Sequence, residues 1–211
     1  MADRKISAHT ALTGANVAAG DLVEVVDISD ATDAASGTNK KILLSQFGGK
    51  FLIEEKTVSA VASISFASIP QEFNHLIIEG YAQTDAAGSQ TDNLHIQFNG
   101  DDTETNYYSQ FLSSINISVS AGEAATARLI NASGATGASP ALFEGRIPEY
   151  KSSIIKSAFA KSYINRVSGA DLQIITFLTY HDTLTAPITS LGFVSATAAN
   201  ITGVFRLYGA F

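Results

Sequence analysis

The sequence contains no cysteine, no tryptophan, one methionine and only four prolines in 211 residues. Without cysteine, the chain can form neither a disulfide framework nor a thiolate metal site. Its stability must therefore come from packing, and a chain of this length can bury a sufficient core without metals or disulfides. The length fits one core domain with an extension.

Charged residues are also scarce. They make up 16% of the chain, against roughly 25% in ordinary soluble domains, and Ser, Thr, Ala, Asn and Gly fill the balance. Because charged residues are depleted from the cores of protein interfaces, this composition favours a protein whose outside is covered by neighbouring subunits. A secreted β-sandwich would have a similar composition.

The formal net charge is −7, and the largest basic groups are the pairs Arg4-Lys5 and Lys40-Lys41, which argues against nucleic-acid binding. No apolar run approaches the roughly 18 residues of a membrane-spanning helix. The charged N-terminus is not followed by the apolar stretch of a signal peptide. We therefore expect a soluble protein made in the cytoplasm, with no nucleic-acid or membrane partner.

Residues 1–50 form a compositionally distinct arm. Stretches rich in small and polar residues flank one apolar run, Leu22–Ile28, which is long enough for a strand and rich in β-branched residues. Lys41–Leu44 is expected to pair with it as a hairpin. Because an isolated two-stranded hairpin is marginally stable in water, it must dock on its own domain, a sister copy or a host particle. The side chains expected at this interface are Leu22, Val23, Val25, Val26, Ile42 and Leu43.

Residues 51–211 contain repeated runs of alternating or β-branched residues separated by Gly, Asn, Asp and Pro. This pattern, with no long helical period, predicts an all-β domain. The expected strands are Val58–Phe66, Leu76–Gln83, Leu94–Phe98, Tyr107–Val119, Ala124–Ile130, Ala141–Ile147, Ile154–Ser162, Leu172–Tyr180, Ile188–Ala196 and Ile201–Tyr208. Their number and spacing favour an antiparallel, jelly-roll-like β-sandwich, with an immunoglobulin-like sandwich as the alternative.

Two expected strands are apolar on both sides. In Ile174–Leu178 and in Val204–Tyr208, consecutive residues are apolar rather than alternating with polar ones. In an antiparallel protein this indicates that the second side of the strand is also covered. Either a subunit interface or a central position in a two-layer fold would provide the cover.

Four carboxylates lie near the expected strand Leu94–Phe98, and oxygen ligands this close in sequence are typical of sites for hard cations. Their spacing matches no calcium loop. A glycosidase pair is the other reading, but no aromatic subsite lies nearby in the sequence, so solvated loop carboxylates are the favoured interpretation. These residues are Asp92, Asp101, Asp102 and Glu104.

The four histidines, His9, His75, His95 and His181, are scattered and lack zinc-ligand spacing. His181 is followed by Asp182, which could orient its imidazole as a base, but no serine lies in a Gly-x-Ser-x-Gly elbow. The phosphate-binding glycine motifs are absent. We therefore expect no cofactor, no metal site and no enzymatic activity.

Tyr107 and Tyr108 are the candidate ligand contacts. Tyrosines at the edge of a loop can stack on sugar rings or anchor a protein partner. They can equally close the end of a sandwich core.

The N-terminal arm resembles an attachment module of tailed-bacteriophage virion proteins. The resemblance covers about residues 4–47 and is carried by ISAHTALTGANVAAGDL at Ile6–Leu22, by Val25–Asp27 and by Thr38–Ile42. In that family the module precedes varied β-rich domains. Here Gly48-Gly49 follows it, which suggests a flexible joint.

The C-terminal segments Ile188–Leu191 and Ile201–Gly209 resemble terminal sandwich domains of the same class. The resemblance implies a virion protein whose arm binds coat or tail proteins. A homotrimeric capsid decoration, or cement, protein is the first expectation. The alternative is a short tail fibre or receptor-binding protein whose Tyr107-Tyr108 edge contacts host-surface carbohydrate, and a glycan-processing enzyme is a distant third.

Overall fold

The computed structural model describes residues 22–27, 38–43, 49–116, 118–137, 139–165 and 172–211. Among these residues the one helical element is the 3₁₀ turn η4, Glu104–Asn106, and the other elements are β-strands. The expected all-β class is therefore confirmed. No helix in the described part of the chain has the length and apolarity needed to cross a bilayer.

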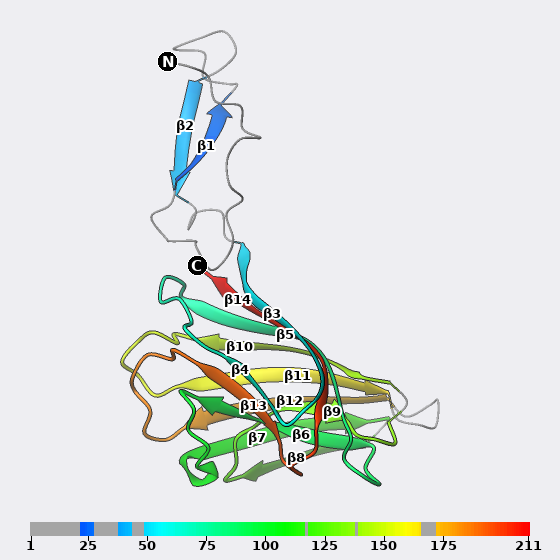
Figure 1. Ribbon diagram of the computed structural model, residues 1–211. Coiled ribbons are helices and arrows are strands. Elements are labelled where there is room, and N and C mark those ends of the chain that lie inside the picture. Colours follow the sequence, from blue (N-terminus) through cyan, green and yellow to red (C-terminus); the bar gives the residue numbers. More distant parts are fainter. Residues whose placement is uncertain (1–21, 28–37, 44–48, 117, 138, 166–171) are drawn as a thin grey trace.

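The predicted arm hairpin is present. Strand β1, Leu22–Asp27, pairs antiparallel with β2, Thr38–Leu43, so that Leu22 lies opposite Leu43 and Val25 opposite Lys40. The two strands make a sheet of their own. In Figure 1 the hairpin lies apart from the remaining strands, beyond the end at which β3 begins and β14 finishes.

The remaining strands form two layers. The short sheet has the order β4 (Ser63–Phe66), β13 (Leu191–Ser195), β6 (Thr91–Phe98) and β9 (Arg128–Ser133). The long sheet has the order β3 (Lys50–Val61), β14 (Ile201–Ala210), β5 (His75–Thr84), β10 (Ala141–Pro148), β11 (Ser157–Asn165), β12 (Leu172–His181), β7 (Tyr107–Ile115) and β8 (Ser118–Ala124). All pairings are antiparallel except one parallel bridge, between Gln83 and Ser133, that joins the sheets.

Eight of these strands follow a jelly-roll arrangement. Strands β3, β5, β10 and β14 lie in the long sheet, and the strand next to each along the chain, β4, β6, β9 or β13, lies in the short sheet. The chain thus crosses repeatedly between two four-stranded layers, as in a jelly roll. The hairpins β7–β8 and β11–β12 then widen the long sheet beyond β10, as the stacked strands in Figure 1 show.

The main core lies between the two sheets, where alternate residues of each strand point inward. In β10, Phe143 and Ile147 are buried whereas Leu142, Glu144 and Arg146 are exposed. Most of the largest buried side chains are aromatic, and the ring of Phe205 on β14 packs against those of Phe143 on β10 and Phe193 on β13 of the opposite sheet.

Two predicted strands are each divided by a turn. The expected strand Val58–Phe66 is the end of β3 followed by β4, with a break near Ala60, which has a φ of 52°. The expected strand Tyr107–Val119 is β7 and β8, with Asn116 at a φ of 53°. Neither segment contains a Gly or Pro to signal a turn, so the apolar pattern alone reads as one continuous strand.

Gly80 allows β5 and β14 to approach closely. A Cβ atom added at Gly80 would lie 1.9 Å from the backbone oxygen of Val204 and 2.9 Å from the ring of Phe143. We expect Gly80→Ala to lower the free energy of unfolding by at least about 2 kcal/mol, because the strands would have to separate. Urea denaturation would measure this.

The matched control is Gly49→Ala, whose added Cβ would meet no atom closer than 4.0 Å. Equal stability of the two variants would contradict the close β5–β14 approach.

Candidate functional site

The loop between β6 and β7 carries three of the predicted carboxylates. It begins with a tight turn at Asn99 and Gly100, whose φ values are 54° and 76°, a backbone region that Gly and Asn tolerate best. The Asn99 side-chain oxygen accepts hydrogen bonds from the backbone N–H groups of Thr189 and Ser190, at 2.7 and 3.2 Å. These bonds fix the start of the loop, and the next residue, Asp101, lies against His181 at the end of β12.

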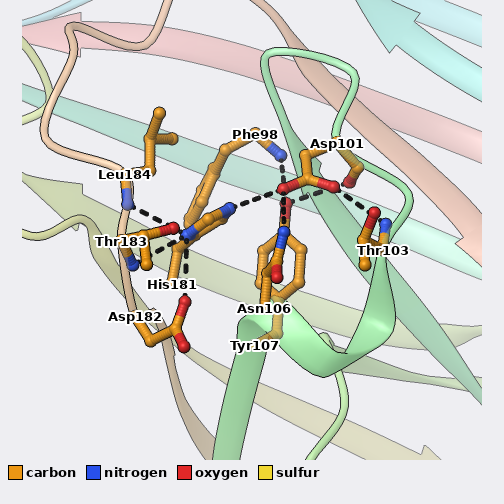
Figure 2. A network of polar contacts seen from close by, with 9 residues as sticks. All are labelled: Phe98, Asp101, Thr103, Asn106, Tyr107, His181, Asp182, Thr183 and Leu184. Carbon is orange, nitrogen blue, oxygen red and sulfur yellow. Dashed lines mark hydrogen bonds and ion pairs between the residues drawn. The ribbon is translucent and has the colours of Figure 1, made fainter.

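Figure 2 shows the polar network that results. His181 Nε2 lies 2.7 Å from Asp101 Oδ2, and the Asn106 side-chain amide donates to the same oxygen at 2.8 Å. The other oxygen, Oδ1, accepts from the backbone N–H of Thr103 at 2.8 Å. The carboxylate of Asp101 thus connects Thr103 and Asn106 in the loop with His181 at the end of β12.

The second nitrogen of His181 is also occupied. Its Nδ1 accepts from the backbone N–H of Leu184 at 3.0 Å and of Thr183 at 3.3 Å. This arrangement assigns the proton to Nε2, which donates it to Asp101. The sequence pointed to Asp182 as the orienting carboxylate, but its oxygen is 3.9 Å from Nδ1 and Asp101 takes that role instead.

The network stabilises a charge without exposing a reactive group. Burial opposes ionisation of Asp101, but hydrogen bonds from Asn106, Thr103 and His181 outweigh it and hold the pKa of Asp101 below its ordinary value. His181 is only 3% exposed, and neither of its nitrogens is free to take a proton from a substrate. The Asp101–His181 pair, here called the loop clasp, holds the loop in place and leaves no ring nitrogen free to act as a general base.

A second histidine holds the same loop. His95, on β6, places Nδ1 2.9 Å from the Glu104 carboxylate. Burial lowers the pKa of His95, and the neighbouring Glu104 opposes that effect. Two buried histidines from different strands therefore fasten the loop through two different carboxylates.

The four carboxylates do not form one site. Asp101 and Glu104 are engaged as described, and Asp102 is exposed. Asp92 is buried within β6, where it accepts hydrogen bonds from Ser195 Oγ at 2.6 Å and from Thr197 Oγ1 at 3.1 Å. Within the described residues, no group of three or more potential ligands could hold a metal ion.

Of the two interpretations of Tyr107, the structure favours the one in which it closes the end of the sandwich core. Tyr107 is fully buried, its hydroxyl donates to the backbone oxygen of Asp101, and it accepts from the backbone N–H of Phe98. Burial raises its pKa to about 12. Tyr108 has the opposite orientation: it is 41% exposed and stacks on Tyr180, with ring centroids 5.4 Å apart.

Tyr108 belongs to a wide exposed surface. We call the outward side of β10, β11, β12, β7 and β8 the outer face. Its strand register places Phe159 beside Leu178, Leu112 beside Thr176, and Tyr108 beside Tyr180. The sequence predicted a covered second side for only one part of this surface, the apolar run Ile174–Leu178.

The predicted arm interface is placed in the hairpin. Leu22, Val23, Val25 and Val26 lie in β1, and Ile42 and Leu43 lie in β2, with Val23 opposite Ile42. Their docking on a partner stays a prediction.

The loop clasp should stabilise the fold in a pH-dependent way. Because the pKa of Asp101 is lower in the folded chain than in the unfolded one, its contribution is fully present above about pH 5. The contribution is lost progressively as the pH falls through about 4, the unfolded value, toward the lower folded pKa. Asp101→Asn should therefore lower the free energy of unfolding by about 1–3 kcal/mol at neutral pH. The variant should also flatten the loss of stability below about pH 4.

Urea denaturation at a series of pH values measures both effects. Asp102→Asn is the matched control, because it removes the same charge from the adjacent, exposed residue. If both variants had the same pH profile, Asp101 would not be the stabilising carboxylate.

Comparison of the chain with protein-family models, with curated protein sequences and with solved structures finds no significant match to any of them.

Proposed function

We propose that this protein is a structural component of a tailed-bacteriophage virion. In this role the arm, residues 1–50, attaches to the particle and the sandwich is displayed on its surface. A capsid decoration or cement protein, assembled as a homotrimer on the shell, is the favoured form. The protein would be made in the host cytoplasm and incorporated into the virion.

The observation that carries the proposal is the separate arm hairpin. Strands β1 and β2 pair with each other and with neither sheet of the sandwich. A two-stranded hairpin gains little stability in water, so an apolar one such as Leu22–Asp27 with Thr38–Leu43 is suited to binding an edge or surface offered by another protein. The resemblance of about residues 4–47 to phage attachment modules supports coat or tail proteins as the class of partner.

The polar network of the sandwich agrees with a role in display. His181 and Asp101 hold a loop with hydrogen bonds that already use both ring nitrogens. Such a loop is kept in one conformation, which suits a scaffold that must survive outside the cell. General-base catalysis by His181 would instead require a ring nitrogen that is free to accept a proton and lies close to a nucleophile.

Attachment through the arm can be tested with one substitution. Ile42→Asp puts a carboxylate into β2, and we expect at least a tenfold loss of binding to phage particles assembled without the protein, because a charge cannot be buried unpaired at little cost. Co-sedimentation of the full-length chain with such particles measures the binding. The midpoint of thermal unfolding of the sandwich should not change.

Ile155→Asp is the matched control, because Ile155 is 50% exposed in a loop of the sandwich and the substitution is the same. Unchanged binding by Ile42→Asp, or an equal loss in both variants, would contradict attachment through the arm.

A tail fibre or receptor-binding protein is the second candidate, and one observation favours it. The Tyr108–Tyr180 stack borders a hollow of about 390 Å³ that is also lined by Gln110 and Glu123. An aromatic surface beside an amide and a carboxylate is suited to sugar rings and their hydroxyl groups.

This candidate makes a different prediction. Tyr108→Ala should reduce binding to host cells or their surface polysaccharide at least tenfold, because the stacking surface is lost, whereas Tyr81→Ala, an exposed tyrosine on β5, should not. Flow cytometry of labelled protein on host cells measures the binding. Wild-type protein that binds no host surface would exclude this candidate.

A further inference from the structure

Exposed apolar side chains are concentrated on one side of one sheet. The described residues include twelve large hydrophobic side chains that are exposed, and all but Ile154 and Ile155 lie on the outward side of the long sheet. Those on the outer face are Tyr108, Leu112, Val119, Leu142, Phe159, Leu172, Leu178 and Tyr180, and Leu52 and Tyr81 lie beside it on β3 and β5. Contiguous patches of this kind mark interaction sites.

The polarity of β12 is inverted. Its inward residues include Gln173, Thr179 and His181, all buried, whereas its outward residues include Leu172 and Leu178, exposed by 55% and 48%. A strand with one side in the core and one in water has the opposite distribution. The outward side of β12 therefore has the composition expected of a side that is covered by protein.

The strands next to β12 also bury small polar residues while they expose large apolar ones. On β7, Ser109 and Ser113 are buried while Leu112 is 56% exposed. On β11, Ser162 is buried while Phe159 is 45% exposed. The buried polar groups have partners: Gln173 donates to Ser113 Oγ at 3.1 Å, and Ser162 Oγ accepts from the backbone N–H of Asn131 at 3.0 Å.

The outer face reaches the lower end of the size range of protein interfaces. Strands lie about 4.8 Å apart and rise about 3.3 Å per residue, so five strands of about eight residues present roughly 600 Å². Each partner in a standard interface contributes about 800 Å². The face is also formed by paired strands, so it offers a continuous surface rather than a narrow groove.

The charges on the outer face favour a second copy of the chain as the partner. Its acidic residues are Glu123 and Glu144, and its basic residues are Arg146 and Lys161, so the two signs balance. The whole chain has a net charge of −7. Two negatively charged copies repel each other over most of their surfaces. The outer face has no net charge, and its acidic side chains can lie opposite the basic side chains of a second copy. Two copies therefore approach each other through this face at the lowest electrostatic cost.

We propose that the outer face is the surface through which copies of this chain pack against one another. The contact buries the apolar side chains around Leu178 and Leu112 and pairs the charges of β10 and β11 between copies. This inference deepens the proposed self-assembly and rests on it, whereas attachment through the arm is independent of it.

One substitution at the centre of the face tests the proposal. Leu178→Lys leaves the isolated subunit nearly unchanged, because Leu178 is already 48% exposed, but it would bury a charge in the assembly. Analytical ultracentrifugation of the full-length wild-type chain over a micromolar concentration range should show self-association. The variant should raise the dissociation constant at least tenfold.

Ile155→Lys is the matched control. Ile155 is 50% exposed and lies off the outer face, and the substitution makes the same change in charge. It should leave the dissociation constant within twofold of the wild-type value. Circular dichroism of all three proteins checks that the fold is retained.

A second measurement locates the contact directly. Because the chain has no cysteine, Leu178→Cys and Ile155→Cys each provide a single thiol. In the assembled protein the thiol at position 178 should be alkylated at least tenfold more slowly than the thiol at position 155, and on dilution to the subunit the rates should converge.

A monomeric wild-type chain, equal weakening by the two lysine variants, or equal alkylation in the assembly would each overturn the proposal. A monomeric chain whose position 178 is protected only by added host polysaccharide would assign the face to a glycan instead. Particle binding lost in Ile42→Asp would remain in either case, so failure of this inference is distinguishable from failure of the proposed function.

Discussion

The long sheet is apolar on both sides but is covered by protein on only one of them. Its eight strands face a short sheet of four, and the inner side of the extension made by β11, β12, β7 and β8 is lined by small and polar residues as well as by apolar ones. Several large apolar side chains of that extension, among them Leu112, Phe159 and Leu178, nevertheless point outward and are exposed. Since burial of apolar surface is the dominant favourable term in folding and in association, this imbalance is the constraint on which the inferred assembly depends.

The polar interior of the extension has a structural cost that specific contacts offset. Buried Ser, Thr and Gln side chains must find partners, and they do so across strands, as Gln173 does with Ser113. At the end of β12 the same requirement is met by His181, which bonds to Asp101 and to the backbone of the following turn. The extension is thus specified in part by directional polar contacts on its inner side, while its outer side exposes apolar side chains.

In the proposed function the arm attaches the protein to the particle and the sandwich is the displayed domain. The hairpin of β1 and β2 is too small to be stable alone and pairs with neither large sheet. The sandwich has its own aromatic core and a loop fastened by two buried histidines, His95 and His181. A weakly folded attachment segment joined to a rigid displayed domain is a physically reasonable design for a virion component, because only the segment needs to adapt to the partner.

Much of this fold could be predicted from the sequence. Period-two alternation and β-branched runs predicted the all-β class, most strands and the pairing of Leu22–Ile28 with Lys41–Leu44, because these signals are local. The turns near Ala60 and Asn116 were missed, since neither has a Gly or Pro. The site could be predicted less well: Tyr107 and Tyr108 are neighbours in sequence, but their side chains point to opposite sides of β7, one into the core and one to solvent.

The sequence by itself determined the all-β class, most of the strands, and the apolar character of both sides of Ile174–Leu178. Only the tertiary structure decided which side of that strand the short sheet covers, and that Asp101 rather than Asp102 or Asp182 meets His181. The physical reason is that strand alternation is encoded locally, whereas the identity of the covered side depends on which strands the chain brings together across the sandwich.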